Sequence, residues 1–516
     1  MRRRAQRIAA IDVGTNSIHM VIVERHRHGY RIVDREKEMV QLGRGSLEGR
    51  PLTDEAIERG VAALKTMASI AERWKVQQIL AVATSAMREA PNRRRFITAA
   101  ESEAGVKVRV ISGEEEADYI YRAVRSAVDF HDGTALVIDI GGGSAELIVG
   151  KSDEVYFTAS EAIGALRMAQ KFELEGAAGP AAVEACRKHV RKTMKKAIAR
   201  AAAVGFDFTV GTSGTIVTLS EIAGAASPDE ISSGLRWLAR DRLAETIVEL
   251  TPLTAEERAQ RFSVDEKRAE TLLAGAVVLD TLMERLGIER LRSCDAALRE
   301  GLIEYVIDRE EGDSGASGRS GSGGSVRRSS VMTLAERSEV ELSHASHVAR
   351  LALRLFDQTP EIHHLKTVER ELLEYAALLH EVGTHVSYQG HHKHSYYLIS
   401  HAGLRGFTTE QVMVVANVAR YYRKAQPSDE HSNFASLTRP QKETVRKLSS
   451  ILRVADGLDR SRRGVVRDLV IADRDGVLTI RLRLRGDAEI EVAAAAKQAR
   501  YLGKVFDRHV DFEITS

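Results

Sequence analysis

Two short segments of this 516-residue chain share a pattern that limits the folds it can adopt. Residues 8–23 read IAAIDVGTNSIHMVIV, and residues 136–150 read LVIDIGGGSAELIVG. In each, an apolar run meets an Asp and a turn of small polar residues, and a second apolar run follows, which predicts a β-hairpin. Small turn residues leave backbone N–H groups open to phosphate oxygens. One such turn is commonly a hairpin and nothing more, but two in one chain indicate a duplicated anion-binding unit.

The turns supply the first candidate site residues. The phosphate-binding candidates are Thr15, Asn16, Ser17, Gly141, Gly142, Gly143 and Ser144. Asp12 and Asp139 precede the two turns, where a hydrated Mg²⁺ would bridge a carboxylate to the anion. Paired phosphate hairpins of this kind are shared by actin, sugar kinases and the large heat-shock chaperones, so the chain resembles a two-lobed, actin-like α/β fold.

Composition narrows the class of protein. Apolar residues at 43% and charged residues at 29% are ordinary for a globular chain, and the length predicts roughly three or four domains. The only cysteines, Cys186 and Cys294, favour neither a disulfide framework nor a thiolate metal site. The apolar run near 272–279 is too short for a membrane span, and no signal-peptide core follows the N-terminus. We therefore expect a cytoplasmic protein with neither a membrane nor a nucleic acid as partner.

Periodicity divides the chain into five parts. Strands and helices alternate over 1–125 and 126–311, which predicts two α/β lobes. A Gly/Ser-rich segment at 312–330 predicts a flexible linker. Residues 331–465 are helical by pattern, and 466–516 return to strand character as a small α/β module.

A basic stripe marks the predicted helix over 183–201. Apolar residues recur there at helical spacing, and the other positions carry many cations with one acid, Glu184, at the start. A solvated outer face is one interpretation. Because like charges at this spacing repel, the second is an anion-binding surface. Its candidate polyphosphate ligands are Arg187, Lys188, Arg191, Lys192 and Lys195.

Two further motifs lie between the hairpins. ATSAMREA at 83–90 follows an apolar strand and places Thr84, Ser85 and Arg88 at the end of that strand. There the planar guanidinium of Arg88 can bind a phosphate through two parallel hydrogen bonds. ISGEEEADYIYRAV at 111–124 puts three acids in the first turn of a helix. Helix capping favours acids there but does not account for all three.

In this order, the motifs resemble the exopolyphosphatase and guanosine pentaphosphate phosphohydrolase family. The resemblance also includes VGTSGTIVTLSEI at 210–222 and DAALREGLIEYV at 295–306, and it covers residues 8–308. It implies an enzyme that hydrolyses the terminal phosphoanhydride of inorganic polyphosphate or the 5′-terminal phosphate of pppGpp. By the same resemblance Glu116 is the general base, and Thr212, Ser213 and Gly214 face the substrate from the second lobe. Mg²⁺ or Mn²⁺, with Asp12, Asp139 and Glu146, would hold the anion, and Arg88 would offset developing charge.

The second half resembles the helical HD phosphohydrolase architecture. Its residues His344, His380 and Asp456 match metal ligands of that architecture, but Glu381 stands where an Asp is usual. One extra methylene displaces the ligand by roughly 1 Å, enough to disturb a tight metal site, so a vestigial or altered metal site is one interpretation. The resemblance to long members of the exopolyphosphatase family, which carry this His-Glu version as a third domain, implies a substrate-binding role instead. The candidate polyphosphate ligands of this half are His391, Lys393, His394 and Arg423.

Three functions therefore stand side by side. The leading prediction is an exopolyphosphatase that also accepts pppGpp, and the resemblance further implies a homodimer. An ATP-dependent kinase of the same superfamily is the second, although no adenosine-pocket signature is recognisable beyond the GTSGT loop at 211–215. A regulatory binder that senses pppGpp or polyphosphate is the third, and it would have no need of Glu116, Asp139 and Glu146.

Overall fold

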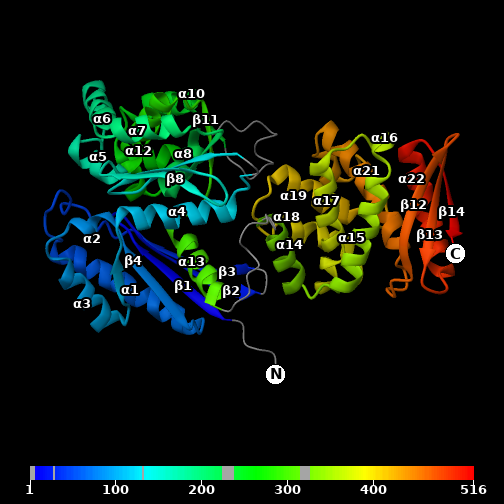
Figure 1. The fold of residues 1–516 in the computed structure, drawn as a ribbon. Coiled ribbons are helices and arrows are strands. Elements are labelled where there is room, and N and C mark those ends of the chain that lie inside the picture. Colours follow the sequence, from blue (N-terminus) through cyan, green and yellow to red (C-terminus); the bar gives the residue numbers. More distant parts are fainter. Residues whose placement is uncertain (1–5, 27–28, 131–132, 224–236, 314–325, 516) are drawn as a thin grey trace. The chain divides into compact units, whose positions relative to one another are not determined.

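The computed structural model describes residues 6–26, 29–130, 133–223, 237–313 and 326–515. The chain divides into two compact units, Met1–Val326 and Arg327–Ser516. The first unit is α/β and the second is mostly helical (Figure 1).

The first unit contains two sheets with the same topology. In one, the order is β3-β2-β1-β4-β5, and in the other it is β10-β11-β9-β6-β7-β8. Each begins as an antiparallel meander of three strands and continues with two parallel strands beside the first strand of the meander. The second sheet adds one more strand, β10, which is antiparallel to β11. The strands are β1 (Arg7–Val13), β2 (Ile18–His26), β3 (Gly29–Glu38), β4 (Gln78–Ala83), β5 (Val108–Val110), β6 (Ala135–Ile140), β7 (Ala145–Gly150), β8 (Val155–Glu161), β9 (Phe208–Thr212), β10 (Trp237–Ala239) and β11 (Arg290–Ser293). This repeated topology confirms the predicted two-lobed α/β fold.

Two helices fill the space between the sheets. Helix α4 (Gly113–Ala127) and helix α13 (Leu298–Asp313) pack against each other, and they share one core with residues of both sheets. Their backbones approach closely, since a Cβ on Gly301 would lie 1.7 Å from the carbonyl oxygen of Tyr119. Helix α13, at the end of the first unit, therefore packs against β1, at its start.

The outer faces of the sheets are covered separately. Helices α1 (Asp54–Arg73) and α3 (Arg93–Ala104) cover the first sheet, and the short α2 (Ser85–Glu89) follows β4. The second sheet is covered by an apolar cluster from α5 (Ala165–Lys171), α6 (Pro180–Thr193), α7 (Lys195–Val204), α8 (Ser213–Ala223), α10 (Arg240–Leu250) and α12 (Glu266–Leu286), with α11 (Ala255–Phe262) at its edge.

Two predicted boundaries differ from the structure. The helix expected over 183–201 is two helices, α6 and α7, because α6 packs on α12 whereas α7 packs on β7 and β8. The predicted linker over 312–330 is helical at its end, where α14 (Val326–Arg337) begins and Arg327 and Ser330 are buried. The centre of that linker lies outside the described residues.

The second unit has one continuous hydrophobic core. Its helices are α14, α15 (Leu342–Asp357), α16 (Pro360–His363), α17 (Thr367–Leu379), the 3₁₀ turn η1 (Val382–His385), α18 (His391–Ser400), α19 (Thr409–Arg420), α20 (Ser432–Ala435), α21 (Arg439–Gly457) and α22 (Glu489–Phe506). A sheet of β12 (Val466–Arg474), β13 (Val477–Leu484) and β14 (His509–Thr515) follows, in the order β12-β13-β14. Residues of this sheet and of α22 belong to the same apolar cluster as the helices, so residues 466–516 have no core separate from 331–465.

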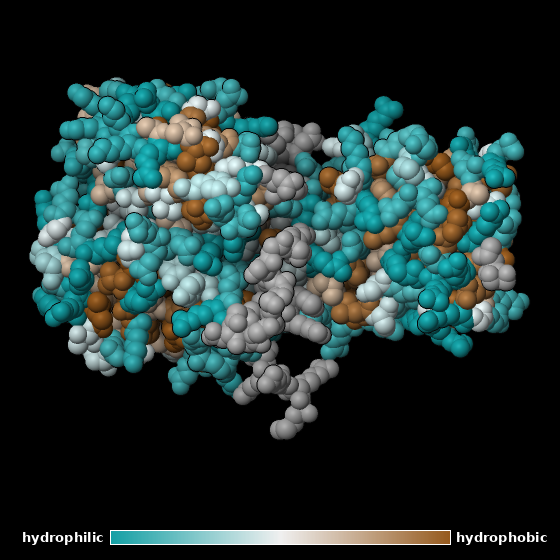
Figure 2. Space-filling model, in the orientation of Figure 1, coloured by the Kyte–Doolittle hydropathy of each residue, from teal (hydrophilic) through white to brown (hydrophobic). Residues whose placement is uncertain are grey.

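One face of the molecule is coloured by hydropathy in Figure 2. Figure 2 shows a face dominated by hydrophilic residues, with apolar residues in scattered patches. Among the described residues, no helix combines the length and the apolar composition needed to cross a membrane.

Candidate active site

The two hairpin turns meet at one cavity in the first unit. The cavity is lined by both turns, by the start of α2 and by the start of α8. A Cβ on Gly143 would lie 2.7 Å from Thr15 Oγ1 and 2.5 Å from Ser85 Oγ, so the turns approach each other too closely for any larger residue at 143. The structure thus brings Thr15, Asn16, Ser17, Thr84, Ser85, Ser213, Gly214 and the 141–144 turn together, as predicted from the sequence.

The second turn is held by helix α5. The backbone amides of Gly164, Ala165 and Arg167 donate to the carbonyls of Gly143, Gly141 and Gly142, at 3.2, 2.8 and 3.1 Å. Arg167 adds a side-chain hydrogen bond of 2.8 Å to the carbonyl of Gly143. These bonds occupy the carbonyls of the turn, so the groups it can offer an anion in the cavity are N–H donors.

Helix α4 positions Glu116. Ser112 caps the helix in a capping box with Glu115, whose carboxylate accepts from Ser112 N at 2.9 Å. Glu114 is exposed, whereas Glu116 is buried and lines the cavity. The three acids thus have separate surroundings, and of the three only Glu116 lines this cavity, whereas Glu114 lines a neighbouring hollow.

Arg88 binds Glu116 and does not line the cavity. Its Nη1 donates to Glu116 Oε2 at 2.6 Å and to the Ile111 carbonyl at 3.2 Å. It faces a second hollow, beyond Glu116, which also contains Ser112 and Ser160. The hollow also contains Ser85 and Ser144, and only Nη1 of the guanidinium makes these two bonds, so the contact of Arg88 with phosphate stays a prediction.

Burial dominates the electrostatics of the carboxylates around the cavity. Loss of solvent raises the pKa of Asp12 to about 7. Loss of solvent, with the charges of Glu116 and Asp12, raises the pKa of Asp139 to about 8. The pKa of Glu146 is raised well above its usual value, also mainly by burial. Burial likewise raises the pKa of Glu116, and Arg88 opposes that rise.

These carboxylates suit a hard cation. Asp12 Oδ1, Asn16 Oδ1 and Glu146 Oε2 are buried acceptors with no hydrogen-bond partner among the described residues. Mg²⁺ prefers such oxygens, and it commonly takes one or two carboxylates with waters and substrate phosphates completing its shell. The residues present therefore fit Mg²⁺ or Mn²⁺, which would supply positive charge to a phosphate chain beside Asp12, Asp139 and Glu146.

The raised pKa values predict how the chelator-treated protein responds to pH. An acid whose pKa is higher in the folded state binds more protons when folded, so its contribution to stability falls as pH rises. For Asp139 this loss spans the interval from 3.8, its usual value, to about 8. Without Mg²⁺, we expect the Tm of Asp139→Asn to fall less steeply across this pH interval than the Tm of wild type. Added Mg²⁺ should make the fall less steep in both proteins. Parallel curves for the two proteins without Mg²⁺ would contradict this electrostatic account.

Arg299 and His19 line the cavity, although the sequence patterns do not indicate them as site residues. An Arg299 N–H group donates to His19 Nδ1, and His19 Nε2 lies 2.7 Å from Ser17 Oγ. A guanidinium can only donate, so Nδ1 accepts and the ring proton is on Nε2. Ser17 Oγ therefore accepts from His19 and keeps its own proton for an anion. The motif DAALREGLIEYV contains Arg299, but only the packing of α13 against β1 and β2 shows where it points.

The second-lobe loop differs in detail from the prediction. Ser213 has φ +79°, an uncommon backbone conformation for a residue other than glycine, and its hydroxyl donates to the Ile140 carbonyl at 2.8 Å. A Cβ on Gly214 would lie 2.5 Å from the guanidinium of Arg268, a second cavity residue that sequence reasoning missed. Thr212, by contrast, is fully buried and donates to the Ala296 carbonyl at 2.6 Å, so it is not a phosphate ligand here.

The basic stripe is only partly open. Arg187 pairs with Asp280 on α12, and Arg191 lies 3.0 Å from Glu184 and 3.2 Å from Glu284, which is also on α12. These pairs correct the expectation that Glu184 is the only nearby acid, because the acids of α12 are distant in sequence. Lys188, Lys192 and Lys195 are exposed.

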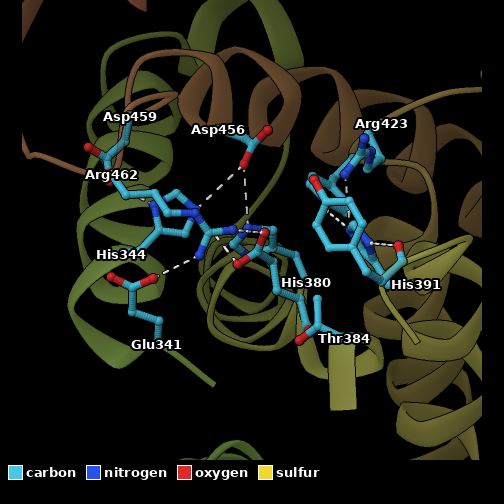
Figure 3. A network of polar contacts seen from close by, with 12 residues as sticks. Glu341, His344, His380, Thr384, His391, Arg423, Asp456, Asp459 and Arg462 are labelled. Carbon is cyan, nitrogen blue, oxygen red and sulfur yellow. Dashed lines mark hydrogen bonds and ion pairs between the residues drawn. The ribbon is translucent and has the colours of Figure 1, made fainter. Parts of the chain in front are cut away.

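In the second unit the predicted basic residues have different surroundings. His391 is buried, with its ring nitrogens 2.9 Å from the Tyr388 carbonyl and 2.5 Å from Tyr422 Oη, so it is not a surface ligand. Arg423 lies 3.2 Å from the same ring, Lys393 is exposed and His394 is half-buried. The predicted HD-like residues His344, His380, Glu381 and Asp456 lie in one cluster (Figure 3).

Comparison with known proteins agrees with this geometry. The Ppx/GppA phosphatase family matches residues 21–310, and Ppx/GppA phosphatase, domain III, matches residues 326–485. The guanosine-5′-triphosphate,3′-diphosphate pyrophosphatase of Vibrio vulnificus is 30% identical over 421 residues, 81% of each chain. That of Photobacterium profundum is 29% identical over 416 residues, 81% of this chain and 80% of the relative.

Solved structures support the fold of the first unit. An exopolyphosphatase from Cytophaga hutchinsonii aligns with a TM-score of 0.55 and 26% identity, covering 59% of this chain and 98% of that chain. The fold is therefore actin-like, with two lobes built on the repeated sheets. From the matched families, the relatives and the shared fold, this chain belongs to the Ppx/GppA phosphatase family.

Proposed function

We propose that the first unit hydrolyses the terminal phosphoanhydride bond of a linear phosphate chain, with inorganic polyphosphate and pppGpp as substrates. The observation that carries this proposal is the position of Glu116, which is buried at a cavity formed by two phosphate-type turns. Relatives named for pppGpp hydrolysis and a structural neighbour named as an exopolyphosphatase support both substrates.

The chain's own residues account for the main requirements of phosphoryl transfer. The N–H groups of residues 142–144 and the hydroxyl of Ser17 bind the terminal phosphate, because they are donors at the cavity. The Gly141 N–H is not counted with them, since it donates to the Ser144 carbonyl at 3.0 Å. Arg268 and Arg299 place permanent positive charge beside it. Glu116 takes a proton from the attacking water, and Arg88 orients that carboxylate.

The substrate preference is tested by measuring released orthophosphate. We would assay the full chain with long-chain polyphosphate, pppGpp and ATP at equal concentrations of terminal phosphate. Release from polyphosphate or pppGpp, well above release from ATP, supports the proposal. Release from none of them favours the sensing role, and transfer of the ATP phosphate to a hydroxyl acceptor favours the kinase.

The second unit is proposed to hold long chains. We expect a protein ending at Asp313 to hydrolyse short substrates but to release long polyphosphate between cuts, because Lys393 and other exposed cations of the second unit are then missing. Since fewer cations then meet the phosphates, affinity should also depend less steeply on salt. Product length on gels and binding at several salt concentrations check this. An unchanged processivity and an unchanged salt slope would assign the second unit another task.

A further inference from the structure

Four potential metal ligands lie together in the second unit, and none of them is used above for hydrolysis. His344 lies on α15, His380 and Glu381 directly follow α17, and Asp456 lies near the end of α21. His344 Nε2 is 4.0 Å from Glu381 Oε2 and 3.8 Å from Asp456 Oδ1, and His380 Nε2 is 3.5 Å from the same Asp456 oxygen. Figure 3 shows the side chains of His344, His380 and Asp456 pointing toward one another.

His380 has a lone pair aimed into this cluster. Its side chain is fully buried, and its Nδ1 lies 2.6 Å from the Ala377 carbonyl. A carbonyl only accepts, so Nδ1 carries the proton and Nε2 carries the lone pair. Among the described residues, Nε2 has no hydrogen-bond partner, which is costly for a buried polar atom unless something else binds it.

His344 is oriented in the same way by its neighbour Asp459. Its Nδ1 lies 2.7 Å from Asp459 Oδ2, and the other oxygen of that carboxylate accepts from Gly464 N at 2.9 Å. The carboxylate thereby fixes the ring and turns Nε2 toward Glu381 and Asp456. A carboxylate or carbonyl on the far nitrogen is the usual outer partner of a metal-binding histidine, and both rings have one.

Arg462 accommodates the longer side chain of Glu381. Its Nη2 donates to Glu381 Oε1 at 2.5 Å, and its Nη1 donates to Glu341 Oε2 at 2.8 Å. This contact leaves Glu381 Oε2 facing His344. The extra methylene, which suggested a displaced ligand from the sequence, is thus compatible with a carboxylate oxygen at the cluster.

We propose that His344, His380, Glu381 and Asp456 bind one divalent transition-metal ion of the Zn²⁺ class. Metal–ligand bonds of about 2.0–2.2 Å in a tetrahedral site separate the ligand atoms by roughly 3.4 Å. The three histidine–carboxylate separations given above are 3.5–4.0 Å, and the ligand atoms of His344, His380 and Glu381 all lie within 4.8 Å of one another. Rotations of the side chains would close these distances around one ion. Two imidazoles with two carboxylates favour a transition metal over Mg²⁺, which prefers oxygen alone. The ion would join three helices that are distant in sequence.

Zinc binding by the full chain tests this site. The chelator-treated protein is titrated with Zn²⁺ by calorimetry in excess Mg²⁺, which occupies the hard carboxylates of the first unit, and bound zinc is counted by elemental analysis. We expect one Zn²⁺ equivalent for wild type and none for His380→Gln. Asp459→Asn should keep the ligands but weaken affinity by about 10–100-fold. Zn²⁺ should raise Tm in wild type and not in His380→Gln.

Two controls identify the site. His363→Gln removes another fully buried histidine of this unit, bonded to the Phe356 carbonyl and to Leu365 N, and should retain the Zn²⁺ equivalent. Asp139→Asn should also retain it. If circular dichroism shows that His380→Gln does not fold, the zinc affinities of Asp459→Asn and Glu381→Gln test the site in its place. The proposal would be overturned if wild type bound no zinc, or if wild type and the folded variants of the ligand residues bound zinc with equal affinity. The cluster would then be a network of ion pairs that binds no metal.

Discussion

Replacing Glu116 with Gln is expected to reduce turnover by about 10²–10⁴-fold, the usual contribution of a general base, with little change in KM. Gln preserves the size and the buried position of the side chain at the cavity but cannot accept a proton. Steady-state phosphate release from polyphosphate measures both constants.

Glu114→Gln is the matched control for this loss. Glu114 is in the same first turn of α4 but does not line the cavity, so its variant should keep wild-type turnover. Retention of more than about a tenth of wild-type turnover by Glu116→Gln would remove Glu116 from the role of base.

Asp139→Asn should raise the Mg²⁺ concentration needed for half-maximal activity by roughly 10–100-fold, the range associated with disturbed metal sites. The variant removes a buried anionic oxygen beside Asp12 and Glu116, the two charges that raise its pKa. High Mg²⁺ should rescue it, and Glu146→Gln should behave similarly. Titrations of phosphate release against Mg²⁺ give the shift.

The exposed Asp153, in the turn after β7, supplies the comparison for this experiment. Asp153→Asn removes the same charge without touching the cavity and should follow the wild-type curve. Superimposable Mg²⁺ curves for Asp139→Asn and wild type would place the metal elsewhere.

The local parts of the fold were predictable because their signals are local. Both hairpins follow from apolar runs around a short turn, and the structure forms each of them. The topology that stacks α4 against α13 depends on contacts between distant segments, including the close approach at Gly301, and no periodicity reports it.

The same limit explains the site residues that sequence reasoning missed or misplaced. Arg299 is hydrogen-bonded to His19, 280 positions away in the sequence. Arg187 pairs with Asp280, 93 positions away. A charge pattern shows which residues are cationic, but not which acids neutralise them. The ion pair between Arg88 and Glu116 joins residues 28 positions apart, and no local pattern indicates it.

Hydrolysis in H₂¹⁸O tests the central claim, that water activated by Glu116 attacks the terminal phosphorus. Wild type acting on polyphosphate should release orthophosphate that carries one ¹⁸O atom from water, with no label in the shortened chain, and Glu116→Gln should release almost none. Label in the shortened chain would mean attack at the penultimate phosphorus. Unlabelled orthophosphate, or equal labelling rates in the two proteins, would contradict the account.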